Sequence, residues 1–212
     1  MLWEIHLTRN EIDRLRLAAE HAIIRWKRSD TLYRYENCCE RKWKCEDGKI
    51  QQLFAPVFCS GSFVKRLWES TGITCLPDPT LRGAGVDIME PGDFLALHRD
   101  AQIHPELKLQ RALSVVINLS DHEGGEFWWD NRLYRPQIGS GLAFVPEIEH
   151  GVSKVEGDRP RVTASCFYYS TPLQKHVITE GRTAAEFVNA EPDFTRTRSK
   201  GIQYVNSEGT GS

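Results

Sequence analysis

Long apolar segments are absent from this sequence. No run approaches the roughly 20 apolar residues that a transmembrane helix requires. The first residues, MLWEIHLTRNE, contain Glu4 and Arg9 and lack the apolar centre of a secretory signal peptide. We therefore expect a cytoplasmic protein that does not bind membranes.

A large excess of charge of either sign is also absent. The 27 basic and 29 acidic residues give a formal net charge of −2. Proteins that bind nucleic acids through phosphates usually carry a basic patch or stripe, and the sequence shows none. We expect no nucleic-acid partner. The 212 residues are enough for one domain with a full core.

Paired CxxC spacing is absent as well. Three of the six cysteines lie together in CCERKWKC at 38–45, without the two CxxC pairs of a zinc ribbon. Because cytoplasmic thiols stay reduced, we expect neither a structural zinc ion nor a disulfide. Cys166 lies in an apolar segment and is expected to pack in the core.

The first part of the chain has helical spacing of its apolar residues. Thr8 and Glu11 form a capping-box pattern, and the helix that follows is expected to end near Arg28. Residues 29–59 look irregular. Ser62 is placed to cap a second helix, which should end near residue 72.

From residue 81 onward the pattern is one of short apolar segments between turn residues. It predicts strands at 83–89, 94–99, 111–119, 126–130, 141–146 and 161–170. Helices followed by many short antiparallel strands indicate a mostly β fold, a jelly roll (double-stranded β-helix) buttressed by N-terminal helices. We expect one domain, with helices and a variable loop at 1–80, the jelly-roll core at 81–172 and a C-terminal extension with a disordered end at 173–212.

The segment FLALHRDAQIH at 94–104 places His98 and Asp100 two residues apart. Since residues i and i+2 of a strand project to the same face, the two side chains are placed to bind one metal ion. An isolated pair of this kind is more often a buried histidine or a chance charge pair. HRD also opens the catalytic loop of protein kinases, but that motif needs an asparagine where this chain has Pro105.

A second histidine in a suitable position is His150, in GLAFVPEIEHGV at 141–152. We expect it on the loop that enters the next strand. Two imidazoles and one carboxylate make up the facial triad of non-haem Fe(II) oxygenases, which leaves three coordination positions open. The other histidines fall in loops or fit surface and packing positions; they are His6, His21, His104, His122 and His176.

The last strand, in GDRPRVTASCFYY at 157–169, has one polar face. Alternation places Arg161, Thr163 and Ser165 on that face. A buried guanidinium is costly unless it meets an anion, and its planar fork suits a carboxylate. A salt bridge to an acidic side chain would also explain Arg161, and Arg159 competes for the carboxylate-binding role.

Five segments carry a resemblance to a known family, and they occur in that family's order. They are PGDFLALHRD (91–100), RALSVVINLS (111–120), GGEF (124–127), GLAFVPEIEHGV (141–152) and RPRVTASCFYY (159–169). The sequence resembles the Fe(II)- and 2-oxoglutarate-dependent dioxygenases, in particular their prolyl-4-hydroxylase-like branch. The resemblance covers about residues 82–170.

The resemblance implies a role for each site residue. His98, Asp100 and His150 would bind Fe(II), and Arg161 would hold the distal carboxylate of 2-oxoglutarate, with Thr163 adding a hydroxyl.

Further contacts are expected from strand alternation. Ser114 and Asn118 share a strand face and could reach 2-oxoglutarate, and Phe127 and Trp129 would line the cavity. Family members often carry a tyrosine at the place of Asn118 or shortly before the metal strand, and this chain carries none there.

The implied activity is an oxygenase reaction that consumes 2-oxoglutarate and dioxygen. Because related halogenases replace the metal carboxylate with a small residue, Asp100 indicates hydroxylation, most simply of an amino acid or amino-acid-like small molecule. A peptidyl-prolyl hydroxylase is the alternative, and a cupin-like metal-binding module without 2-oxoglutarate is a third. Nucleic-acid demethylases of this superfamily carry a second arginine six residues after the first, where this chain has Phe167.

Overall fold

The computed structural model describes residues 1–28, 33–36, 41–45, 48–170 and 186–187. Cys38, Cys39 and the expected disordered end lie outside these residues. Among the described residues, none of the helices is long and apolar enough to cross a membrane.

The described residues contain three helices, all in the N-terminal third of the chain: α1 (Arg9–Arg28), α2 (Gly48–Phe58) and α3 (Gly61–Thr71). The expected capping box at the start of α1 is present, since the Thr8 amide donates to Glu11 Oε2 at 2.8 Å and the Glu11 amide donates to Thr8 Oγ1 at 3.4 Å. The cap of α3 is Ser60, whose hydroxyl accepts from the Phe63 amide, and the prediction of Ser62 was wrong.

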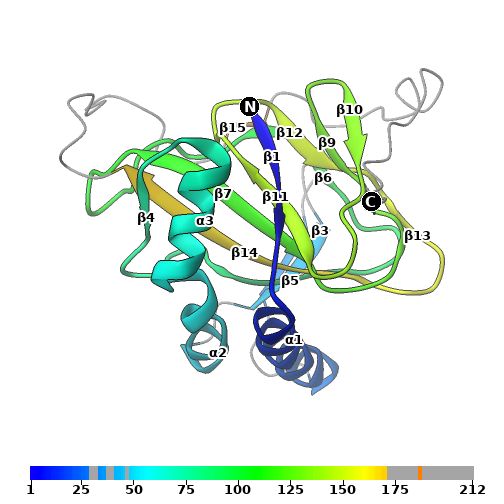
Figure 1. Cartoon of the computed structure of the whole chain (residues 1–212). Helices are drawn as coiled ribbons and strands as arrows, with labels where there is room; N and C mark the ends of the chain where they lie inside the picture. Colours follow the sequence, from blue (N-terminus) through cyan, green and yellow to red (C-terminus); the bar gives the residue numbers. More distant parts are fainter. Residues whose placement is uncertain (29–32, 37–40, 46–47, 171–185, 188–212) are drawn as a thin grey trace, which may run out of the picture.

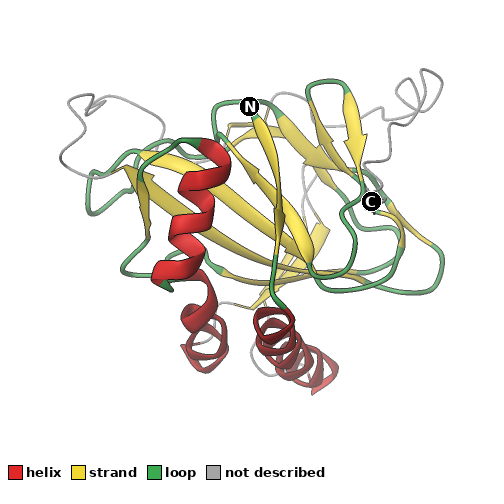
Figure 2. Cartoon of the chain, viewed as in Figure 1, coloured by secondary structure: helices red, strands yellow, loops and turns green. Residues whose placement is uncertain are grey.

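The strands form two antiparallel sheets that face each other, as the jelly-roll prediction requires (Figure 2). The large sheet has the order β1-β11-β7-β14-β5-β3-β2, with β4 beside β14, and the small sheet has the order β10-β9-β12-β6-β15. A separate two-stranded sheet pairs β13 with β8. The bounds of the large-sheet strands are β1 Leu2–His6, β2 Tyr33–Glu36, β3 Arg41–Cys45, β4 Cys75–Pro77, β5 Gly85–Met89, β7 Arg111–Asn118, β11 Ser140–Phe144 and β14 Arg161–Ser170. The remaining bounds are β6 Leu95–Arg99, β8 Glu123–Gly124, β9 Phe127–Trp129, β10 Arg132–Tyr134, β12 His150–Val152, β13 Val155–Glu156 and β15 Glu186–Phe187.

The helices cover the outer face of the large sheet (Figures 1 and 2). Leu15 of α1 and Phe54 of α2 belong to one buried cluster with Ala164, Cys166 and other residues of the sheet. Cys166 is fully buried there, which confirms its expected role in packing. Because β14 alternates, its other face, with Arg161, Thr163 and Ser165, points into the space between the two sheets.

The N-terminal third contains more regular structure than the sequence pattern indicated. Helix α2 lies within the segment expected to be irregular, and strand β1 pairs with β11 at the edge of the large sheet, from Leu2 opposite Phe144 to His6 opposite Ser140. A strand of five residues such as β1 carries a weak local signal, and its pairing with a neighbouring strand decides whether it forms.

Candidate active site

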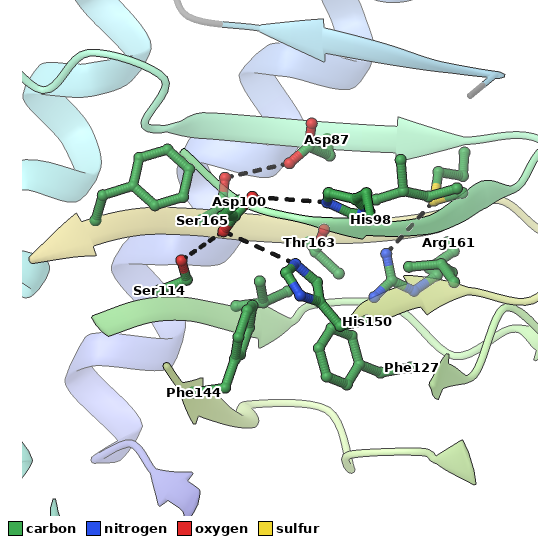
Figure 3. Close-up of a pocket in the computed structure, with 15 residues that line it drawn as sticks. Asp87, His98, Asp100, Ser114, Phe127, Phe144, His150, Arg161, Thr163 and Ser165 are labelled. Atoms are coloured by element: carbon green, nitrogen blue, oxygen red, sulfur yellow. Dashed lines mark hydrogen bonds and ion pairs between the residues drawn. The ribbon is translucent and has the colours of Figure 1, made fainter. Parts of the chain in front are cut away.

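The structure brings His98, Asp100 and His150 together. Strand β6 ends at Arg99, directly before Asp100, and His98 lies opposite His150 in the β6–β12 pair. His150 is therefore the first residue of a strand rather than a loop residue. One possible ligand atom from each side chain lies within 4.8 Å of the other two. The Nε2 atoms of His98 and His150 are 3.6 and 3.8 Å from the two oxygens of Asp100 (Figure 3).

The backbone holds both imidazoles in the orientation that a metal ion needs. His98 Nδ1 is 2.9 Å from the Ala96 carbonyl, and His150 Nδ1 is 2.8 Å from the Ile148 carbonyl. Each Nδ1 must carry the proton to donate to a carbonyl, so each Nε2 presents a lone pair towards Asp100. Two neutral imidazoles and one carboxylate fit Fe(II).

Two side chains from β7 hold one oxygen of Asp100. Ser114 Oγ donates to Asp100 Oδ2 at 2.7 Å, and a guanidinium nitrogen of Arg111 is 3.4 Å from the same oxygen. Burial would raise the pKa of Asp100, but His98, His150 and Arg111 outweigh it and hold this pKa well below its usual range. Ser114 thus supports the carboxylate, where the sequence had suggested contact with 2-oxoglutarate.

Replacement of Ser114 with alanine should weaken iron binding by about tenfold or more, because the carboxylate loses the hydrogen bond that orients it. Anaerobic titration with Fe(II) measures this change. Ser140→Ala is the matched control: Ser140 is also buried, and its hydroxyl donates to the Gln137 carbonyl at 3.1 Å, away from Asp100. Equal iron affinity in the Ser114 variant and the control would contradict the assigned role.

Arg161 is a buried cation in the wall of the same cavity. Its side chain donates to Met89 Sδ at 3.6 Å, and it forms no ion pair with any residue in the described part of the chain. Burial lowers the pKa of Arg161 to about 10, against the opposing effects of Asp87 and Glu126, so the guanidinium is charged at neutral pH. A buried cation of this kind is a suitable site for a carboxylate.

The competing arginine lies elsewhere. Arg159 is exposed and pairs with Asp121 at 2.5 Å. The structure therefore places Arg161, and not Arg159, beside the three metal-ligand candidates.

Gly125 leaves room for the Arg161 side chain. A Cβ atom at Gly125 would lie 2.8 Å from Arg161 Cδ, and the residue has φ +62°. Gly125→Ala should therefore displace the guanidinium and weaken 2-oxoglutarate binding. Gly92→Ala is the control, since Gly92 also has positive φ, +92°, but open space around it. Both variants should lose about 1–2 kcal/mol of stability to backbone strain, and only Gly125→Ala should lose co-substrate affinity in a titration. Equal affinities would contradict this contact.

The remaining predicted residues divide into two groups. Thr163, Ser114 and Phe127 line the cavity. Asn118 does not; its amide donates to the Pro136 carbonyl at 3.0 Å. Trp129 lies outside the cavity too, in a separate groove beside β1. The alternation had suggested that Asn118 could reach 2-oxoglutarate and that Trp129 would line the cavity, and neither residue is among those that line it.

Asp87, Met89 and Arg111 are among the neighbours of the site that sequence reasoning missed. Asp87 and Met89 line the cavity, and Arg111 stacks on Phe167, with its guanidinium carbon 3.8 Å from the ring centre. An acidic residue within the apolar strand GVDIM was a usable signal for Asp87.

The comparisons with known proteins agree with this geometry. Residues 84–169 match the profile of the 2OG-Fe(II) oxygenase superfamily. These residues belong to that superfamily. No curated protein matches the sequence.

Several solved structures share the fold at low sequence identity. A prolyl-4-hydroxylase from Pseudomonas putida is 14% identical, with a TM-score of 0.57 over 80% of this chain and 92% of that one. The viral collagen prolyl hydroxylase vCPH from Paramecium Bursaria Chlorella virus-1 is 13% identical, with a TM-score of 0.52 over 80% and 96%. SnoN, a non-heme alpha-ketoglutarate-dependent epimerase from nogalamycin biosynthesis, is 13% identical, with a TM-score of 0.60 over 100% and 84%.

The 2OG-Fe(II) oxygenase domain makes this protein an oxygenase that depends on Fe(II), 2-oxoglutarate and dioxygen. The observed residues are compatible with both cofactors, since the cavity contains a His-Asp-His cluster in which both Nε2 atoms face the Asp100 carboxylate, and a buried guanidinium.

Proposed function

We propose that this oxygenase hydroxylates an unactivated C–H bond of an amino acid or amino-acid-like small molecule. The observation that carries the proposal is the cluster of His98, Asp100 and His150 in one cavity with Arg161. When bound, iron and 2-oxoglutarate supply dioxygen activation, in which the keto acid becomes succinate and carbon dioxide and one oxygen atom enters the substrate.

The residues of this chain would hold and orient the reactants. His98 and His150 would bind the metal through their Nε2 atoms, and Asp100 through one carboxylate oxygen. Ser114 and Arg111 would restrain the other oxygen of Asp100. Because Asp100 occupies a metal position that a halide would otherwise need, the proposed outcome is hydroxylation.

The far end of the co-substrate would lie against β14. Arg161 and Thr163 line the cavity on one strand face, so a carboxylate on Arg161 would also come within reach of the Thr163 hydroxyl. Phe127 stacks on His150 with ring centres 5.7 Å apart, and the Phe144 ring centre is 4.6 Å from that of His150, so two apolar rings pack on this imidazole. These rings would exclude water from the reacting atoms.

The size of the substrate is the second part of the proposal. Most of the side chains that line the cavity are buried between the two sheets, which suits a small enclosed molecule. The alternative, a peptidyl-prolyl hydroxylase, is favoured by the shared fold with the prolyl hydroxylases from Pseudomonas putida and the Chlorella virus.

A substrate screen distinguishes the two candidates. Purified enzyme with Fe(II), 2-oxoglutarate and dioxygen is incubated with free amino acids and, in parallel, with proline-containing peptides, and succinate release is measured. The proposal expects that one or more free amino acids or close analogues stimulate succinate release by the unaltered enzyme. No compound should stimulate succinate release by the Asp100→Ala enzyme. Stimulation by the peptides alone would replace the proposal with the peptidyl alternative.

A further inference from the structure

Asp87 is a carboxylate in the active-site cavity that the proposed chemistry does not use. It lies on β5 opposite Thr163 of β14, and it shares the face that points between the sheets. The residue is buried, with 9% exposure, and its Oδ2 accepts a hydrogen bond from Ser165 Oγ at 3.2 Å. Neither the three metal-ligand candidates nor the proposed 2-oxoglutarate contacts include Asp87 or Ser165.

The order of residues along β14 gives the cavity two ends. Arg161, Thr163, Ser165 and Phe167 follow one another on the lining face. Figure 3 shows Ser165 on the side of the metal cluster away from Arg161, with Asp87 bonded to it. If 2-oxoglutarate extends from the metal towards Arg161, the space beside Asp87 and Ser165 belongs to the substrate.

Asp87 and Ser165 are the polar residues that β5 and β14 contribute to this end of the cavity. Val116 of β7 lies opposite Ser165, and Phe167 follows Ser165 on the same face of β14. Both line the cavity and suit the hydrocarbon part of a substrate. A buried carboxylate has lost most of its hydration, so a positively charged nitrogen gains more from it than it would in water. A second anion would be repelled.

We infer that Asp87, positioned by Ser165, selects a substrate that carries a positively charged nitrogen, such as an ammonium or guanidinium group. The inference rests on the proposed function and narrows its substrate class to cationic amines. Asp87 also acts on Arg161 through its charge. If Asp87 acted only through its charge on Arg161, the Asp87→Asn variant would change 2-oxoglutarate binding and leave the choice of substrate unchanged.

The test adds matched pairs of compounds to the full chain, which has first been loaded anaerobically with Fe(II) and 2-oxoglutarate. The cationic members are L-arginine, L-lysine and n-butylamine, and their neutral-side-chain counterparts are L-citrulline, Nε-acetyl-L-lysine and n-butanol. Each compound is titrated while the visible absorption band of the iron-chelated keto acid is followed. At least one cation should perturb the band at a concentration about tenfold or more below that of its counterpart.

Three variants complete the test. Asp87→Asn should remove this preference and Ser165→Ala should reduce it, while Asp158→Asn is the control because that carboxylate is 95% exposed. The inference is overturned if the band forms in the unaltered enzyme but the cations perturb it at no lower concentration than their counterparts. It is also overturned if the preference for cations persists in the Asp87→Asn enzyme. If the unaltered enzyme forms no band, the proposed function itself fails, and a band in Asp87→Asn shows that this variant is folded.

Discussion

Asp100→Ala enzyme should show no measurable 2-oxoglutarate turnover. Asp100 is the one carboxylate of the metal cluster, and without it two neutral imidazoles face an ion of charge +2. Loss of a residue that merely supports a ligand costs about 10- to 100-fold in affinity or activity, and loss of the ligand itself should cost more. His150→Ala should have the same effect, measured as succinate formation at saturating iron.

The control for this experiment is Asp121→Ala. Asp121 is exposed and pairs with Arg159 on the surface, so its removal should leave turnover unchanged. Substantial turnover in purified Asp100→Ala and His150→Ala enzymes would contradict the assignment of the metal site.

Arg161→Ala enzyme should bind 2-oxoglutarate roughly 30-fold more weakly, or worse, while iron affinity changes little. The guanidinium is buried and charged, and the loss of one partner from a buried charged pair costs about 2 kcal/mol or more. Separate anaerobic titrations with Fe(II) and with 2-oxoglutarate measure the two affinities.

Arg159→Ala provides the matched comparison, because it removes the same side chain two residues away. Its partner is the exposed Asp121, so co-substrate affinity should stay within about twofold of the unaltered enzyme, as expected for a surface ion pair. If Arg159→Ala weakens 2-oxoglutarate and Arg161→Ala does not, the two arginines exchange roles.

The predictions from sequence were most accurate where a pattern is strictly periodic. Alternation in β14 placed Arg161, Thr163 and Ser165 on the cavity face and Cys166 in the core, and both placements agree with the structure. The two-residue spacing of His98 and Asp100 likewise brought both side chains to one side of β6.

Alternation failed where the sheet is irregular. Arg111 and Ser114 should point to opposite faces, yet both approach Asp100. The pairing of β7 with β14 shifts register between Tyr168 and Tyr169, which turns Arg111 to the side of Ser114. A shift of this kind depends on the partner strand and leaves no mark within the segment that contains it.

Other errors reflect tertiary context. The segment at 29–59 looked irregular because it is rich in Tyr, Trp and Lys. Helix α2 lies within it, and its residues Ile50, Phe54, Val57 and Phe58 lie at helical spacing and are all buried. For Ser114, the strand face was predicted correctly, but not its bond to Asp100, because the pattern of one strand does not identify the side chain opposite.

The central claim is that one cavity binds iron through His98, Asp100 and His150 and 2-oxoglutarate through Arg161. The most direct measurement is an anaerobic titration of the Fe(II)-loaded protein with 2-oxoglutarate, followed by visible absorption. We expect the charge-transfer band of an iron-chelated keto acid to appear and saturate, and to be absent from Asp100→Ala enzyme. Iron binding without any such band would contradict the account and favour a metal-binding module that does not use 2-oxoglutarate.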